Sequence, residues 1–284
     1  MNPRLLTQFL ALADNLHFGR ASLESHVSIS ALSRNIKSLE QAVGVSLFHR
    51  DNRSVGLTRE GQKFQIYARE TLANWKAIQY ELSDNSEQLK GEISVYCSVT
   101  AAYTILFDLM NRFRSGFPGI DIKLHTGNPD YAINRIIDGK EDITIAAHPN
   151  TLPRGVVFKP ITISPLLFIT SIDRNETQDD DWLNEPMIMS EGGLARQRVD
   201  AFFKEMNIMP KVYAQVAGFE AIVSMVSLGL GVGVVPKIVL DNSPMADRVR
   251  VLKVKQALKA YNIGLFTLKK NLKNPMVKAF WELV

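Results

Sequence analysis

The sequence has a single cysteine, Cys97, among its 284 residues. An intramolecular disulfide is therefore excluded, and we expect a protein of the reducing cytoplasm. No apolar run reaches the ~20 residues that a helix needs to cross a bilayer, because Ser224, Ser227 and three glycines interrupt the most apolar stretch, residues 222–236. The N-terminus lacks the apolar core of a signal peptide. We therefore expect neither a membrane protein nor a secreted one.

The sequence also lacks the residue patterns of common enzymes. The five histidines are scattered without metal-ligand spacing, and none lies near Cys97 in the sequence. The glycine run 229–233 precedes a predicted strand and does not open a helix, so it fails as a nucleotide-binding loop. There is no P-loop and no nucleophile elbow. We expect no catalytic set, no metal and no cofactor.

Excess charge is also absent, since 33 Lys and Arg stand against 29 Asp and Glu. What is present is 46% hydrophobic residues, enough for a buried core. In the first sixty residues, apolar side chains recur at spacings of 4, 3 and 4 from Leu5 to Leu16, which predicts a helix. A short helix over 18–25 and a third over 29–42 follow, the latter capped by Ser28 and ended at Gly44. Residues 47–50 and 54–57 are predicted as strands around a polar turn.

Two helices joined by a four-residue turn have the geometry of a DNA-reading helix-turn-helix. The alternative is an ordinary helical hairpin in a core. Residues 1–60 hold seven Lys and Arg and five acidic residues, so their net charge is too small to indicate DNA binding by itself. The case for DNA binding depends on where the polar side chains lie. We expect DNA contacts from Arg20, Ser28, Ser30, Ser33, Arg34, Lys37, Arg50 and Arg53.

Residues 58–89 are predicted to form one long helix. Apolar residues at spacings of three and four form a narrow seam along this helix, which is typical of a helix that pairs with another. The alternative is a helix packed on its own domain. The residues expected to form the dimer contact are Phe64, Ala68, Leu72, Trp75, Ile78 and Leu82.

Beyond Gly91, predicted strands and helices alternate, which indicates mainly parallel sheets with helical crossovers. The first unit has strands over 93–97, 120–124 and 143–146 and helices over 101–114 and 131–138. In the second unit we expect strands over 166–170, 187–190, 212–216, 232–235 and 263–267, and helices over 195–206 and 219–228. A closing helix is predicted over 274–283.

Residues 17–22, 27–40, 44–50 and 57–61 together resemble the winged helix-turn-helix of LysR-type transcriptional regulators. The resemblance extends to the long helix, as a dimerising linker, and to the two α/β units, down to residues 229–236. It departs at Ser25, where the family usually has a larger apolar residue, and at Ile29, where a glutamine commonly begins the recognition helix.

The resemblance implies a winged helix-turn-helix over 1–57, a linker helix over 58–90 and an effector-binding domain over 91–284. That domain would consist of two doubly wound, periplasmic-binding-protein-like lobes, lobe I at 91–161 with 268–284 and lobe II at 162–267. It further implies a homodimer or homotetramer on double-stranded promoter DNA, with RNA polymerase as a partner.

A closer similarity lies in residues 50–53, 97–103, 122–127, 220–226 and 242–244. These resemble the LysR-type activators of branched-chain amino-acid biosynthesis that answer to acetohydroxy acids such as 2-acetolactate. That resemblance implies activation of the acetohydroxy acid reductoisomerase gene and repression of the regulator's own gene. One alternative is a LysR-type regulator with another small anionic effector. A two-lobed solute-binding protein is a second alternative, against which the helix-turn-helix argues.

Two tandem lobes leave a cleft, and in open α/β sheets ligands sit at the carboxyl ends of strands. Residues 98–100 follow a strand and open a helix, where free N–H groups and hydroxyls suit an organic anion. The alternative is that Ser98 and Thr100 merely cap their helix. The expected effector-binding residues are Ser98, Val99, Thr100, Thr126, Ala146, Gly218 and Phe219.

Overall fold

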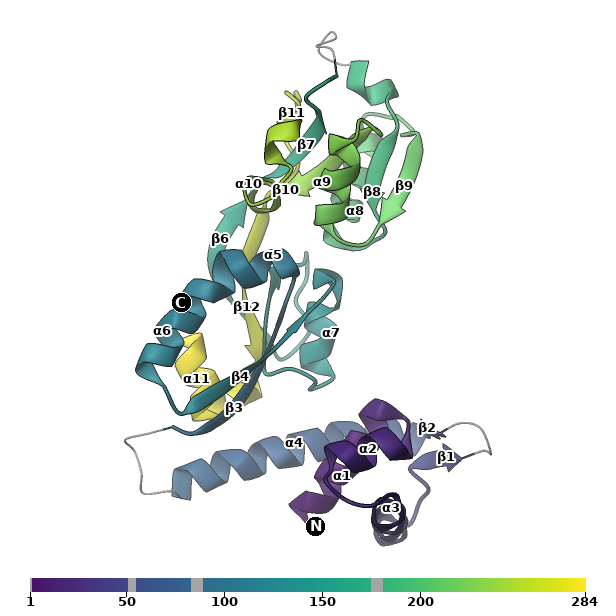
Figure 1. The fold of residues 1–284 in the computed structure, drawn as a ribbon, viewed down its shortest axis with the longest axis vertical. Coiled ribbons are helices and arrows are strands. Elements are labelled where there is room, and N and C mark those ends of the chain that lie inside the picture. The colour runs from purple at the N-terminus through teal and green to yellow at the C-terminus, as the bar shows by residue number, and fades with distance from the viewer. Residues whose placement is uncertain (1, 51–54, 83–88, 175–180) are drawn as a thin grey trace. The chain divides into compact units, whose positions relative to one another are not determined.

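The computed structural model describes residues 2–50, 55–82, 89–174 and 181–284, and they form two compact units (Figure 1). The first unit is built on residues 1–89, and the second on residues 90–272 and 276–284.

The first unit contains the predicted helices in the predicted order. They are α1 (Pro3–Asn15), α2 (Phe18–Glu24), α3 (Ile29–Val43) and α4 (Arg59–Leu82), with the antiparallel strands β1 (Phe48–Arg50) and β2 (Val55–Leu57) between α3 and α4. The Ser28 hydroxyl accepts a hydrogen bond from the Ala31 N–H at 3.2 Å, and Gly44 ends α3 with a φ of 80°. Both signals work as predicted because they satisfy backbone groups that every helix end leaves free.

The second unit contains two five-stranded sheets, each forming the centre of one lobe. The sheet of the first lobe has the order β4 (Ile120–Thr126), β3 (Gly91–Cys97), β5 (Ile143–Ala147), β12 (Tyr261–Leu268) and β6 (Val156–Ser164). The sheet of the second lobe has the order β11 (Val249–Val251), β7 (Leu166–Ser171), β10 (Val232–Pro236), β8 (Met187–Ser190) and β9 (Val212–Val216).

Helices cover both faces of each sheet. Figure 1 shows α7 (Ala132–Ile137) on one side of the first sheet, and α6 (Phe107–Gly116) and α11 (Pro275–Trp281) on the other. In the second lobe, Ile169 of β7 packs in the same core as α9 (Phe219–Ser227), whereas Phe168 contacts α8 (Gly193–Glu205). Neighbouring strand residues point to opposite faces, so α8 and α9 lie on opposite sides. The remaining helices are α5 (Val99–Ala101), which continues into α6 through a π-helical turn, and α10 (Lys237–Asp241).

Two expectations about the sheets need correction. Each sheet is mixed rather than mainly parallel, because β12 pairs antiparallel with β5 and β6, and β7 pairs antiparallel with β10 and β11. The strand predicted over 263–267 was assigned to the second lobe, but as β12 it lies in the first. The expected boundaries of the lobes are therefore wrong for this strand. Its apolar sequence shows that it is buried without showing which strands it pairs with.

Strand β6 was not predicted at all. It carries Pro160, and proline usually argues against a strand because it lacks the N–H of the ladder. Here β6 is an edge strand, and Pro160 pairs with Gly264 next to a register shift in β12. Because β6 ends at Ser164 and β7 begins at Leu166, a single residue leads from one lobe to the other.

Candidate functional site

Helix α3 separates a buried apolar face from an exposed polar one. Leu32, Ile36 and Leu39 are fully buried in the core of the first unit. On the other face lie the polar residues expected to contact DNA. Most of them are exposed, namely Ser28, Ser30, Arg34 and Lys37, together with Arg20 on α2, and Ser33 is half-buried. The side chain of Arg50, and Arg53 entirely, lie outside the described residues.

The exposed face of α3 is held on a rigid support. The Asn35 amide donates to the Gln8 side chain at 2.8 Å, which joins α3 to α1. At the other end, the Glu40 carboxylate accepts from the N–H groups of Leu47 and Phe48 at 2.9 and 3.1 Å. These bonds fix the helix against both its neighbours.

The two departures from the family pattern have structural counterparts. Ser25 ends α2, and its Oγ atom is buried without a hydrogen-bond partner among the described residues. Ile29 is the first residue of α3 and is 55% exposed. An apolar side chain therefore stands at the start of the polar face.

The apolar seam of α4 divides into two parts, and the expectation that all of it contacts a second subunit is wrong. Phe64 and Ala68 are buried in the core of their own unit, where the Phe64 ring packs edge-on against Phe9 at 4.9 Å between centroids. Helix α1 already occupies this half of the seam. The alternative, packing on the helix's own domain, therefore applies to it.

The second half of the seam lines an apolar groove between α1 and α4. Trp75 is 47% exposed and Ile78 is 41% exposed, while Leu72 is partly buried. The Leu82 side chain lies outside the described residues. The groove is lined by Pro3, Leu6, Thr71, Leu72, Asn74, Trp75 and Ile78.

A cavity that is partly open to solvent lies in the second unit. Its lining is mainly apolar, as the lining of a small-ligand site usually is. Among the lining residues Asp130 is the only one with a charged side chain. Both lobes contribute to the lining, which consists of Ser98, Thr100, Ala101, Thr104, Ile105, Pro129, Asp130, Ile145, Ala146, Ala147, Leu194, Phe219, Pro236, Ile238, Val239, Tyr261 and Ile263.

The structure brings together part of the expected effector set. Ser98, Thr100, Ala146 and Phe219 line the cavity, and Gly218 lines a smaller adjoining pocket with Phe219. Val99 and Thr126 do not line either space, and both are exposed. Thr126 ends β4, which is the edge strand of its sheet, so it lies to one side of the cavity.

The two hydroxyls at the start of α5 have different roles. Ser98 caps the helix, since its Oγ accepts from the Ala101 N–H at 3.2 Å. Thr100 does not cap. It is buried, and its hydroxyl donates to the carboxylate of Glu220 on α9 in the other lobe. The side chain of Thr100 therefore joins the two lobes at the cavity.

A second junction lies at the N-terminus of α8, whose N-cap residue, Gly192, has no side chain to offer. The Leu194 N–H faces the Asp130 carboxyl group, and the Ala195 N–H faces the Tyr261 hydroxyl. Burial raises the pKa of Asp130 and that of Tyr261, and each N–H lowers the pKa of the side chain that it faces by a smaller amount. A Cβ atom on Gly193, where φ is 73°, would lie 1.9 Å from an Asp130 oxygen, so this approach requires glycine. Residues of the first lobe thus lie close to the N-terminus of a helix of the second.

Sequence reasoning missed Asp130, Tyr261 and Glu220. A signal for Asp130 existed, because Asn-Pro-Asp after a strand is a strong turn sequence. Tyr261 begins the strand that was assigned to the wrong lobe. Glu220 lies in residues 220–226, where the family resemblance is the only signal in the sequence.

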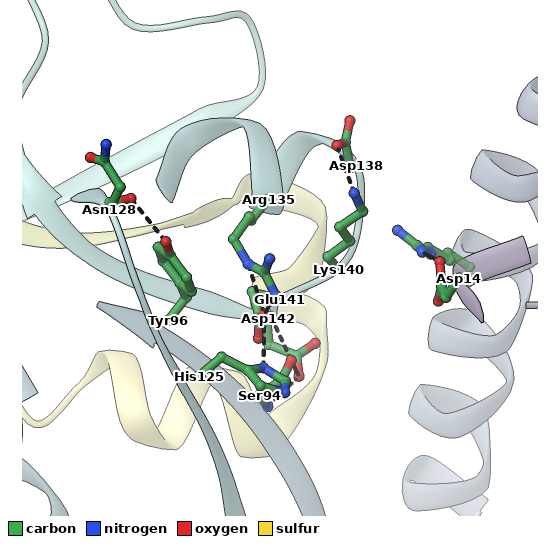
Figure 2. Close-up of polar contacts among 11 residues, drawn as sticks. Asp14, Ser94, Tyr96, His125, Asn128, Arg135, Asp138, Lys140, Glu141 and Asp142 are labelled. Atoms are coloured by element: carbon green, nitrogen blue, oxygen red, sulfur yellow. Dashed lines mark hydrogen bonds and ion pairs between the residues drawn. The ribbon is translucent and has the colours of Figure 1, made fainter. Parts of the chain in front are cut away.

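The turn that carries Asp130 is anchored by Tyr96. The Tyr96 hydroxyl donates to the Asn128 carbonyl at 2.8 Å, and the Asn128 side chain accepts from the Asp130 N–H at 3.0 Å. Figure 2 shows the Tyr96 ring next to the guanidinium group of Arg135, 4.6 Å from the ring centroid. The ring is thus held between the turn and the cation.

Arg135 is itself fixed by Glu141, whose carboxylate is fully buried. Arg135 Nε lies 3.0 Å from Glu141 Oε1, and His125 Nδ1 lies 2.9 Å from the same oxygen (Figure 2). A buried carboxylate is stable only when it is paired. This cluster therefore positions the cavity rim through Tyr96.

Cys97 is fully buried, and desolvation raises the pKa of its thiol to about 12. A thiol in this state is a poor nucleophile. In residues 2–50, 55–82, 89–174 and 181–284 there is no cluster of three His, Cys, Asp or Glu side chains that could hold a metal ion. In the same ranges, none of the helices combines the length and the hydropathy needed to cross a membrane.

Comparison with known proteins identifies relatives of both units. The model of the LysR substrate binding domain matches residues 86–284, and that of the bacterial regulatory helix-turn-helix proteins of the lysR family matches residues 3–62. The HTH-type transcriptional activator IlvY of Salmonella typhimurium is 38% identical over all of this chain and 99% of its own length. IlvY of Haemophilus influenzae is also 38% identical, over 97% of each chain.

Solved structures share the fold. A full-length variant of OxyR from Pseudomonas aeruginosa aligns with a TM-score of 0.74 at 22% identity, over 99% of this chain and 94% of that one. CbnR in complex with its target DNA aligns with a TM-score of 0.63 at 22% identity, over 99% and 98%.

Proposed function

Since the chain belongs to the LysR family of bacterial transcriptional regulators, we propose that it controls branched-chain amino-acid biosynthesis in response to an acetohydroxy acid. The observation that carries this proposal is the 38% identity to IlvY activators over the whole chain. Under this proposal it activates the acetohydroxy acid reductoisomerase gene together with RNA polymerase and represses its own. Its target is chromosomal DNA, so its site of action is the cytoplasm.

For the DNA contact we propose that α3 enters the major groove. Ser30, Ser33 and Arg34 face base edges, and the hairpin arginines, Arg50 and Arg53, contact phosphates. Base contacts give sequence preference, and phosphate contacts give affinity that falls with salt. Support comes from the exposed polar face of α3 and from its rigid attachment.

We further propose that residues 58–90 join two subunits, which places two helix-turn-helix heads on an inverted repeat. The groove between α1 and α4 would receive the partner's α4. Contacts between effector domains would then join two dimers into a tetramer. The apolar side chains available for the first contact are Leu72, Trp75 and Ile78.

Replacing Leu72 and Trp75 together with serine should weaken self-association, because it removes apolar surface from the interface. Sedimentation velocity across a dilution series measures the effect. Ile66→Ser is the matched control, since Ile66 is exposed on the same helix and outside the groove. If the double variant sediments as wild type does at every concentration, α4 is not the interface.

The cavity of the second unit is the proposed effector site. It is enclosed by both lobes, so a ligand that contacts both favours one arrangement of them over others. The carboxylate of the effector would accept from the Thr100 hydroxyl. The lining residues include no lysine or arginine, so a bound anion would have to be held by hydrogen bonds and apolar contacts and not by an ion pair with the lining.

Isothermal titration of the wild-type protein with 2-acetolactate should show saturable binding, and Thr100→Val should raise Kd about tenfold, the loss of one hydrogen bond to a charged group. Thr126→Val is the matched control because Thr126 is exposed outside the cavity. If Thr100→Val bound 2-acetolactate with the Kd of the wild type, the effector site would lie elsewhere. Wild-type binding of a different small anion instead would favour another LysR-type pathway. If the wild-type protein did not shift promoter DNA in a gel-shift assay, the alternative of a solute-binding protein would be favoured.

A further inference from the structure

Thr100 and Glu220 are 120 positions apart in the sequence, yet the hydroxyl of Thr100, which lines the cavity, donates to the carboxylate of Glu220, an exposed residue of the other lobe. Thr100 is only 3% exposed. A buried hydroxyl keeps a hydrogen-bond partner because leaving it without one costs free energy. The partner here is a carboxylate, which is the chemical group that the proposed effector would also present to Thr100.

The other polar groups at this end of the cavity are already engaged within the protein. Asp130 and Tyr261 face the N–H groups of Leu194 and Ala195, and Ser98 caps α5. The Thr104 hydroxyl donates to the Thr100 carbonyl at 2.8 Å. The bond between Thr100 and Glu220 is therefore the contact that a ligand can replace with the least disturbance.

We propose that Glu220 selects effectors that carry a hydroxyl group on the carbon next to their carboxylate. The ligand would separate Thr100 from Glu220 and bridge them: its carboxylate accepts from the Thr100 hydroxyl, and its 2-hydroxyl donates to the Glu220 carboxylate. This inference rests on the proposed function of the cavity as the effector site.

The selectivity follows from donor and acceptor counting. A 2-hydroxy acid offers an acceptor to Thr100 and a donor to Glu220, so both partners remain satisfied. A 2-oxo acid or a 2-alkyl acid offers no donor at that carbon. It would leave the Glu220 carboxylate without a donor in place of the Thr100 hydroxyl, and this loss opposes its binding relative to the 2-hydroxy acid. The negative charge of the ligand is the same in both acids and does not distinguish them. Glu220 thus acts mainly by excluding acids that lack the hydroxyl.

The test compares two ligands that differ only at this group. In 2,2-dimethylacetoacetate a methyl group replaces the hydroxyl of 2-acetolactate. Isothermal titration of the full-length wild-type protein should show at least tenfold weaker binding of the dimethyl compound. In Glu220→Ala the two affinities should become equal within about twofold, because the acceptor of the hydroxyl proton is gone.

Two further variants make the result specific. Glu205→Ala should keep the wild-type preference, since Glu205 bonds Gln256 at the far end of α8. Glu220→Gln keeps the size of the side chain and one acceptor oxygen, so it should retain a reduced preference for the hydroxyl even if Glu220→Ala does not fold. Thermal unfolding and promoter binding establish that each variant is folded.

The outcomes separate the inference from the proposed function. Equal binding of both compounds to the wild type would overturn the role of Glu220 and leave the acetolactate response in place. If acetolactate does not bind, the proposed effector is wrong, and the pair 2-hydroxyisobutyrate and pivalate tests Glu220 by itself. A wild-type preference for the hydroxy acid that is lost in Glu220→Ala would then support the inference. The same preference in both proteins, or no preference in the wild type, would overturn it.

Discussion

Glu141→Ala should lower the free energy of unfolding of the second unit by about 1–3 kcal/mol, as expected when a hydrogen-bonded partner is removed from a partly buried polar group. Glu141 is 2% exposed and is the shared partner of Arg135 and His125. Without it the Arg135 guanidinium lies in a partly buried place with no counter-charge. Because Arg135 stacks on Tyr96, which anchors the turn of Asp130, the loss should also weaken ligand binding. Urea denaturation measures the first effect and titration the second.

Asp241→Ala is the matched control for this comparison. Lys237 and Asp241 also form an ion pair, at 2.6 Å, but both side chains are about half exposed. Exposed pairs contribute about 0–1 kcal/mol, so this variant should unfold close to the wild type. Equal losses in Asp241→Ala and Glu141→Ala would contradict the argument that burial makes the Glu141 cluster important.

Arg34→Ala should weaken binding to the operator by about 1–3 kcal/mol, the range of discrimination that a bidentate arginine–guanine contact supplies. Arg34 lies on the exposed face of α3, opposite the buried Leu32 and Ile36. Binding to random DNA should fall much less, because a base contact contributes little to nonspecific affinity. Fluorescence anisotropy with both DNA sequences at fixed salt measures the two losses.

A phosphate contact by Arg34 would give a different result. Specific and random DNA would then weaken equally, and the salt dependence of binding would become shallower by about one phosphate. Arg154→Ala, an exposed arginine of the second unit, controls for a general effect of charge and should change neither affinity. Equal weakening of the two DNAs by Arg34→Ala would therefore refute base reading by this residue.

Much of the first unit is determined locally, and this is why its sequence predicts it well. The spacing of Leu32, Ile36 and Leu39 places one face of α3 in the core, and Ser28 and Gly44 set its ends through bonds within a few residues. Residues that must face away from such a core are identified by the same periodicity. The exposure of the polar residues that we propose to contact DNA could thus be predicted without knowing any tertiary contact.

The apolar seam of α4 shows where local pattern stops being informative. Its periodicity correctly indicates that another helix packs along it, but it does not say which one. Phe64 and Ala68 pack in the core with α1 of the same chain, and among the described residues of the seam Trp75 and Ile78 are the exposed ones. Whether α4 packs on α1 of its own chain or on a helix of a second subunit depends on the tertiary structure, which the spacing of apolar residues does not determine.

The cavity that we propose as the effector site depends most on tertiary structure. The sequence by itself indicated Ser98, Thr100 and Phe219, because strand ends and helix starts are local features. Tyr261 lines the cavity because β12 returns to the first lobe after the chain has built the second, and Glu220 meets Thr100 because the second lobe lies against the first. The residues of an apolar strand are enough to predict that it is a strand. Which strands it pairs with depends on packing and hydrogen bonds with the partner strand as well, and these cannot be read from one strand alone.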